Sequence, residues 1–199
     1  MLRKKILVQN IRAGRPNPGL ASQHLESILA LIRISGAQTS SSNLRKGSTE
    51  FDLDGRPIPK SSDGISTEID LVTAGSITLC IQCILPYLLT LRSPSNVRII
   101  GGTHVLKAPN FDYLERVFLP IMNTMMGNEI NAKMLRPGYF PRGGGCISLN
   151  VNPIPNIFNP VNLIDRGNLV RTHAIINVTP KLNRWINEFK QLVSGKMEL

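Results

Sequence analysis

Apolar and polar residues alternate with two different periods along this chain, and together these patterns predict strands interleaved with helices. Short apolar runs and alternation with a period of two predict strands at residues 6–11, 50–53, 67–71, 96–100, 130–135 and 146–151. Apolar residues spaced three and four apart predict helices at residues 25–32, 76–89 and 114–125. Because the two kinds of element alternate, we predict an α/β (α+β) fold.

Two of the predicted helices contain the same Leu-Pro step, and each follows a strand. The steps are Leu85-Pro86 and Leu119-Pro120. A shared step in two strand–helix units hints at an internal repeat.

The composition changes after residue 151. Residues 152–162 are rich in proline and asparagine and are interpreted as a connector. Beyond it, alternation from Val170 to Val178 predicts a strand, and Thr179-Pro180 opens a predicted helix. One strand and one helix bury too little surface to be stable alone. We therefore predict a core domain at 1–157 and the beginning of a second domain at 158–199.

The charge of the chain narrows the choice of partner. There are 23 Lys and Arg against 13 Asp and Glu, a formal net charge of +10. This balance favours an anionic partner such as RNA, a nucleotide or an acidic membrane, and it also fits plain solubility. Residues 1–25 and 130–164 contain no acid but several cations and glycines. If these two stretches meet in space, they form an electropositive cleft.

The stretch from Ile11 to His24 is the best candidate for holding phosphate. Arg12 and Arg15 lie in a glycine-containing loop between a strand and a helix, and Asn17-Pro18 can begin that helix. A helix N-terminus beside arginines suits an anion, although most such loops are solvated turns. The local sequence at 142–145 (Arg-Gly-Gly-Gly) favours a tight turn over an anion contact.

Cysteine and histidine give no strong indication of catalysis or metal binding. Cys80 and Cys83 form a C-x-x-C pair inside an apolar helix, which favours a buried helix face over zinc or redox chemistry. The three histidines stand in no triad spacing. Gln82 lies in the same apolar helix and must either hydrogen-bond the backbone or face a ligand. Gln82 and Pro86 also interrupt this segment, so we predict no membrane span.

Several motifs, in order along the chain, resemble those of the RNA 3'-terminal phosphate cyclase family. Order and spacing agree over most of the sequence, and the intact Ile-Arg-Ala-Gly-Arg and Gln-His elements resemble the cyclase branch rather than the non-catalytic ribosome-assembly branch. The motifs are Ile11-Arg-Ala-Gly-Arg15 with Pro18-Gly19-Leu20 and Gln23-His24-Leu25, Thr73-Ala-Gly-Ser76 with Gln82 and Leu85-Pro86, Gly101-Gly-Thr103 with Ala108-Pro109, Phe118-Leu-Pro120, Gly138-Tyr-Phe-Pro-Arg-Gly-Gly-Gly145, and Asp165-Arg-Gly167.

The resemblance implies a fold of repeated βαβαββ-type units, similar to the C-terminal domain of a bacterial translation initiation factor, with a small α/β domain inserted. It also implies an ATP-dependent ligase that converts an RNA 3'-phosphate to a 2',3'-cyclic phosphate through enzyme-AMP and RNA-adenylate intermediates. ATP and a divalent metal such as magnesium are the implied cofactors, and RNA 3'-phosphate ends are the implied partner. The implied location is nuclear for a eukaryotic source and otherwise cytoplasmic.

By the same resemblance, five residues are expected to face the nucleotide and its phosphates: Arg12, Arg15, Gln23, His24 and Gln82. No catalytic residue is assigned, because the family's nucleophilic histidine lies in a C-terminal region that this sequence does not match. The family's opening glycine-rich segment is not matched either. We therefore expect a truncated form that cannot form the covalent AMP adduct by itself.

Two other interpretations stay open at this point. The chain could be a non-catalytic relative that binds RNA or assists ribosome assembly, or a generic phosphate-binding α/β protein. RNA binding that is indifferent to ATP would favour the first of these two.

Overall fold

The chain folds as two compact units, Met1–Val161 and Asn162–Leu199, which are considered separately. The computed structural model describes residues 4–40, 44–55, 63–72, 74–154, 160, 162–165, 167–177 and 180–197.

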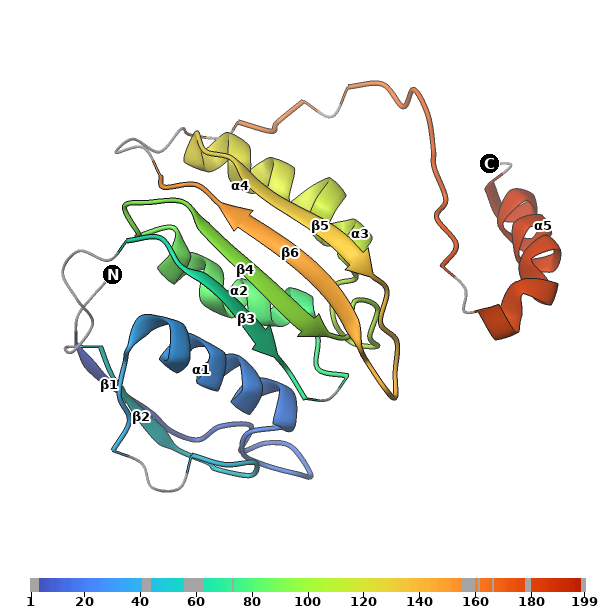
Figure 1. The fold of residues 1–199 in the computed structure, drawn as a ribbon. Helices are drawn as coiled ribbons and strands as arrows, with labels where there is room; N and C mark the ends of the chain where they lie inside the picture. The colour runs from blue at the N-terminus through green and yellow to red at the C-terminus, as the bar shows by residue number, and fades with distance from the viewer. Residues whose placement is uncertain are drawn as a thin grey trace. The chain divides into compact units, whose positions relative to one another are not determined.

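The first unit is organised around a four-stranded mixed sheet with strand order β3-β4-β6-β5 (Figure 1). β3 and β4 run parallel, and β6 is antiparallel to both of its neighbours. The strands fall where the polarity pattern predicts them, at β3 Ser66–Asp70, β4 Ser95–Gly101, β5 Ile130–Arg136 and β6 Gly145–Val151.

One face of this sheet is covered by helices. α2 (Ile77–Leu88) connects β3 to β4, while α3 (Phe111–Tyr113), a π-helical turn η1 (Leu114–Phe118) and α4 (Leu119–Met126) connect β4 to β5. The chain order from β3 to β6 is therefore βαβαββ. This agrees with the predicted mixed fold and with its repeat unit.

The core lies between the helices and the sheet. Ile81 and Ile84 on α2 meet Ile99 and Ile147 of the sheet, and all four side chains are fully buried. Burial alternates along β4 because successive side chains point to opposite faces of a strand. The opposite face of the sheet is polar, and there Arg98 Nε pairs with Glu68 Oε2 at 3.2 Å.

A smaller β–α–β segment precedes the four-stranded sheet in the chain and belongs to the same first unit. β1 (Lys5–Val8) pairs antiparallel with β2 (Phe51–Asp54). α1 (Ser22–Ser35) packs beside α2, where the Cys83 Sγ donates to the Ser27 carbonyl at 3.5 Å. The strand and helix expected around the basic loop are therefore confirmed.

The helix after the basic loop begins later than predicted. Asn17-Pro18 do not start α1, since its N-cap is Ala21. Gly19 has a φ of +83°, which is incompatible with a helix, and its N–H donates to the Ile11 carbonyl at 2.7 Å. The loop is thus folded back on the end of β1 before the helix can begin.

The predicted helix at 114–125 is interrupted by a π turn. The Leu119 N–H donates to the Leu114 carbonyl, five residues back. Pro120 has no N–H, so the regular bond to residue 116 cannot form, and the helix accommodates this with a wider turn.

The second unit holds a 3-10 turn η2 (Pro180–Trp185) and α5 (Ile186–Met197), which confirms the helix expected there. The strand expected from Val170 is wrong over the described residues 167–177, which are extended and exposed, and Val178 lies outside them. Alternation marks a strand only where a neighbouring strand can pair with it, and no strand is found among the described residues of this unit.

Candidate functional site

The carboxyl ends of β3, β4 and β5 lie at one edge of the sheet. α1 and α2 begin at the same end of the first unit (Figure 1). Three loops therefore gather there, at residues 9–21, 102–110 and 137–144. Ligands of sheet proteins bind preferentially at such an edge, because loops and helix N-termini converge on it. We call it the strand-end edge.

Arg12 is fixed in place within the first of these loops. Its Nη1 donates to the Gly19 carbonyl at 3.0 Å, and its own backbone has a φ of +51°. The Arg15 N–H donates to the Arg12 carbonyl at 3.0 Å and closes a turn, which leaves the Arg15 side chain exposed. The loop thus presents one anchored and one exposed guanidinium just before α1.

Gln23 and His24 occupy the first turn of α1, immediately after this loop. His24 Nδ1 accepts a hydrogen bond from the Ala21 N–H at 3.2 Å. In the neutral ring the proton therefore resides on Nε2, which makes Nε2 a donor. The first turn of α1 contains no acidic residue. Four of the five expected nucleotide contacts therefore come from one short stretch at a helix N-terminus.

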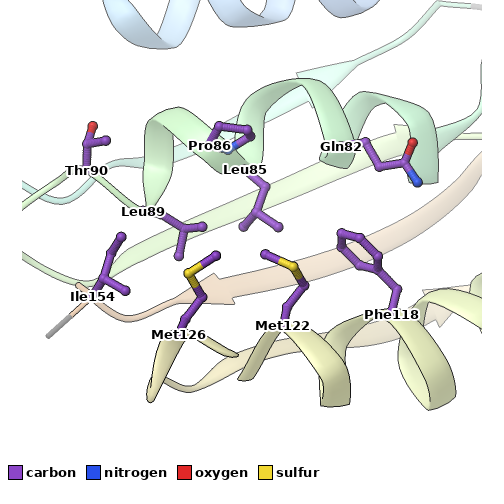
Figure 2. A pocket seen from close by; sticks show the side chains of 9 residues that line it. All are labelled: Gln82, Leu85, Pro86, Leu89, Thr90, Phe118, Met122, Met126 and Ile154. Atoms are coloured by element: carbon purple, nitrogen blue, oxygen red, sulfur yellow. The ribbon is translucent and has the colours of Figure 1, made fainter. Parts of the chain in front are cut away.

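Gln82 lies on a different side of α2 from α1. The next residue, Cys83, contacts α1, whereas Gln82 is exposed and borders a groove between α2 and the η1–α4 helix (Figure 2). Of the two roles considered for Gln82 in the sequence, this position at the border of a groove fits a residue that faces a ligand. The groove has a volume of about 460 Å³ and is mainly apolar, lined by Gln82, Leu85, Pro86, Leu89, Thr90, Phe118, Met122, Met126 and Ile154.

One helical turn connects Gln82 to the strand-end edge. Thr78 lies four residues earlier on α2, and its hydroxyl donates to the Pro109 carbonyl at 2.6 Å. Pro109 belongs to the loop that follows β4. The Gln82 end of the groove is therefore the end closer to the three loops, while Thr90 and Ile154 mark the other end.

A hydrogen-bonded clamp holds two of the three loops together, and sequence reasoning missed it. The fully buried Thr103 hydroxyl accepts from the Gly138 N–H at 2.9 Å and donates to the Gly138 carbonyl at 3.1 Å. His104 stacks on Tyr139 with ring centroids 5.4 Å apart, and its Nε2 pairs with Asp112 Oδ2 at 3.1 Å. The only sequence signal was the proximity of a Gly-Gly-Thr-His run and a Gly-Tyr step to strand ends.

The cysteine pair carries no reactive thiol. Burial raises the pKa of Cys80 to about 12, with Cys83 and Glu26 adding smaller contributions, and burial also raises the pKa of Cys83. These thiols stay protonated near neutral pH. Within the described residues, no group of three or more His, Cys, Asp or Glu side chains could hold a metal ion. The interpretation of Cys80 and Cys83 as part of a helix face is confirmed, because both lie on α2 and Cys80 is buried.

A membrane-spanning helix was not expected. Over the part of the chain that the structure describes, none of the helices has the length and apolar character needed to cross a bilayer.

Comparison with known proteins gives one consistent answer. The family model described as RNA 3'-terminal phosphate cyclase matches residues 1–196. Proteins of that name are similar to this chain: one from Staphylothermus marinus is 38% identical over 172 residues, 86% of this chain and 46% of the relative.

Two further relatives with the same name are similar. One from Korarchaeum cryptofilum is 43% identical over 150 residues, 75% of this chain and 41% of the relative. One from Ectopseudomonas mendocina is 39% identical over 164 residues, 82% of this chain and 46% of the relative. The chain thus spans about half the length of the curated relatives it matches. A match that runs from the basic loop through the strand-end loops into the second unit confirms the resemblance seen in the motifs, and this chain belongs to the RNA 3'-terminal phosphate cyclase family.

Proposed function

We propose that this chain supplies the ATP-binding part of an ATP-dependent RNA 3'-phosphate cyclase. In this proposal ATP lies across the N-termini of α1 and α2, and an RNA 3'-phosphate approaches the same edge. The observation that carries it is the stretch from Arg12 to His24, where two guanidinium groups and a histidine donor surround a helix start with no carboxylate in its first turn.

The phosphates are proposed to bind at the start of α1. The N–H groups of a first helical turn point outward and carry positive partial charge, and arginine adds charge-assisted hydrogen bonds. Arg12 is already oriented by Gly19, so little side-chain entropy is lost when it binds an anion. Arg15 and the His24 Nε2 donor are exposed beside it. This arrangement suits a polyphosphate better than a single small anion.

The adenine ring is proposed to enter the groove at its Gln82 end. Apolar walls with one amide match a flat heteroaromatic ring that has both donors and acceptors on its edge. Phe118 lies across the groove from Gln82 (Figure 2). The nucleotide would then pass the start of α2 to reach Arg15.

A divalent metal is proposed only as the ion that accompanies ATP. Mg²⁺ is usually bound by substrate phosphates and one or two carboxylates. Since no cluster of metal-ligating side chains exists among the described residues, we derive no step through a metal held by this chain. For the location, the relatives named above are archaeal and bacterial, so the nuclear alternative has no support in these comparisons.

Equilibrium binding of radiolabelled ATP to the full chain tests the proposal. Arg15→Gln removes an exposed charge from the loop and is expected to weaken ATP binding about tenfold or more, the usual worth of a charge-assisted hydrogen bond. Gln82→Ala is expected to weaken it by a few fold and to reduce the preference for ATP over GTP. Arg33→Gln, at the opposite end of α1, is the matched control for charge.

Two results would count against this proposal in different ways. If Arg15→Gln and Arg33→Gln bind ATP equally well, the phosphates are not held at the start of α1 and the proposal is wrong. If the chain binds RNA with an affinity that ATP does not change, the interpretation as a non-catalytic RNA-binding relative gains support.

A further inference from the structure

The loop between β5 and β6 exposes the ring of Phe140 to solvent, and cationic side chains lie in the same part of the chain. The Phe140 side chain is 75% exposed, although phenylalanine is usually buried. Arg142 follows two residues later and is also exposed. Across the clamp, the loop after β4 exposes Leu106 at 91% and Lys107. Apolar and cationic groups therefore share one surface at the strand-end edge.

This surface is held rigidly rather than being the tip of a loose loop. The Gly143 N–H donates to the Tyr139 carbonyl at 2.8 Å, and Arg136 Nε donates to the Gly144 carbonyl at 2.7 Å. Gly138 is packed so closely on Gly145 that a Cβ at Gly138 would overlap the Gly145 nitrogen. With the Thr103 clamp, these contacts fix the backbone on both sides of Phe140 before any ligand binds.

The charges favour a polyanion. Between Glu129 and Asp165 the sequence has no acid, so Arg136 and Arg142 have no carboxylate of their own segment nearby. The nearest acid on the facing loop segment, Asp112, is already paired with His104. An exposed ring bordered by cations is the arrangement that proteins use for single-stranded nucleic acid, where bases stack on aromatic rings and the backbone follows the positive charge.

We infer that Phe140 is a stacking platform for a base of single-stranded RNA near its 3' end, with Arg142 and Lys107 contacting the flanking phosphates. This inference rests on the proposed function for the identity of the nucleic acid, and it adds the surface that holds the strand. Double-stranded RNA does not fit, because a paired base cannot leave its stack to lie on Phe140 without unpairing.

Fluorescence anisotropy with the full chain tests the inference. The probe is a 5'-fluorescein oligouridylate of about twelve nucleotides with a 3'-phosphate, a length within the range of known single-strand sites. Phe140→Leu keeps an apolar side chain but removes the ring, and it is expected to weaken binding about tenfold. Phe140→Trp is expected to retain or strengthen binding. Leu7→Ala, at another exposed apolar position, is the control.

A second probe separates stacking from charge. An oligomer of abasic ribose phosphates has the same charges but no bases, so Phe140→Leu is expected to leave its affinity unchanged. Arg142→Gln is expected to weaken both probes and to reduce the slope of log K against log salt by about one.

The inference is overturned if wild type does not bind the RNA, if Phe140→Leu binds it as tightly as wild type, or if Phe140→Leu weakens both probes equally. ATP binding by the wild-type chain is measured in parallel. Absence of ATP binding with intact Phe140-dependent RNA binding would contradict the proposed function alone, whereas ATP binding with no effect at Phe140 would contradict this inference alone.

Discussion

Replacing Thr103 with valine removes one hydroxyl and keeps the shape of the side chain. That hydroxyl is fully buried and is the acceptor for the Gly138 N–H at 2.9 Å. In Thr103→Val this N–H loses its acceptor. The Gly138 carbonyl keeps the backbone N–H of Thr103 at 2.9 Å, so two groups lose their partner: the buried Gly138 N–H and His104 Nδ1, which lies 2.8 Å from the hydroxyl.

The loss of stability in Thr103→Val follows from these broken hydrogen bonds. A buried donor left without a partner costs roughly 1–3 kcal/mol of unfolding free energy. With a urea m-value of about 2 kcal/mol/M, the midpoint of unfolding of Thr103→Val falls by about 0.5–1.5 M. Thr103→Ser loses a buried methyl group instead, costs about 1 kcal/mol, and keeps the acceptor for Gly138.

Global stability alone cannot separate these two variants, so amide hydrogen exchange at Gly138 is the deciding measurement. Exchange is expected to speed up strongly in Thr103→Val and to stay slow in Thr103→Ser. Unfolding is followed by circular dichroism, because the single tryptophan, Trp185, belongs to the second unit and the clamp belongs to the first. Wild-type exchange at Gly138 in Thr103→Val would refute the role of the clamp.

Three further predictions follow from packing and ionisation. Gly19→Ala places a Cβ against the Gly47 carbonyl at a φ of +83°, so it is expected to lower stability by roughly 1–3 kcal/mol in thermal unfolding and to weaken ATP binding in a titration. Gly14→Ala, with open space around the added Cβ, is expected to leave stability within error. Ile84→Ala, in the core, is expected to cost about 2–5 kcal/mol in urea, and exposed Gln82→Met on the same helix about 0.5 kcal/mol or less. The free energy of unfolding is expected to fall as pH rises from 9.0 towards about 12, because burial raises the pKa of Cys80 from 9.0 in the unfolded chain to about 12 in the folded one. Urea unfolding measured at a series of pH values checks this, and Cys80→Ala is expected to reduce the fall. A fall of the same size in Cys80→Ala would contradict the burial argument.

Most of the first unit could be predicted from the spacing of its apolar residues, because its longer helices and the strands of the four-stranded sheet have one face in the core. β1 is an exception, since Ile6 is 50% and Leu7 61% exposed. The alternation along residues 146–151 and the three- and four-residue spacing after residue 76 both reflect burial against the same layer. Where no such layer exists, the pattern misleads. Val170 begins a good alternation, but it is 93% exposed and the described residues around it pair with nothing in a sheet.

The parts of the site that come from one stretch were also accessible to sequence reasoning. Arg12 and His24 share a loop and a helix start, so their grouping needs no knowledge of the fold. The clamp between Thr103 and Gly138 joins residues 35 apart and depends on the order of strands in the sheet. The exposed position of Gln82 likewise depends on where α4 lies, and Phe140 could be recognised as a platform only once its exposure was known.

The order in which the strands of the four-stranded sheet follow one another in the chain has a consequence for folding during translation. Its most distant backbone partners are Ser95 and Val151, so all of its pairings lie within a window that ends before the second unit begins. Contacts between near neighbours in sequence form quickly, and nascent chains fold from their N-terminal side. All the strand pairings of the β3–β6 sheet can therefore form without any residue from Asn162 onward.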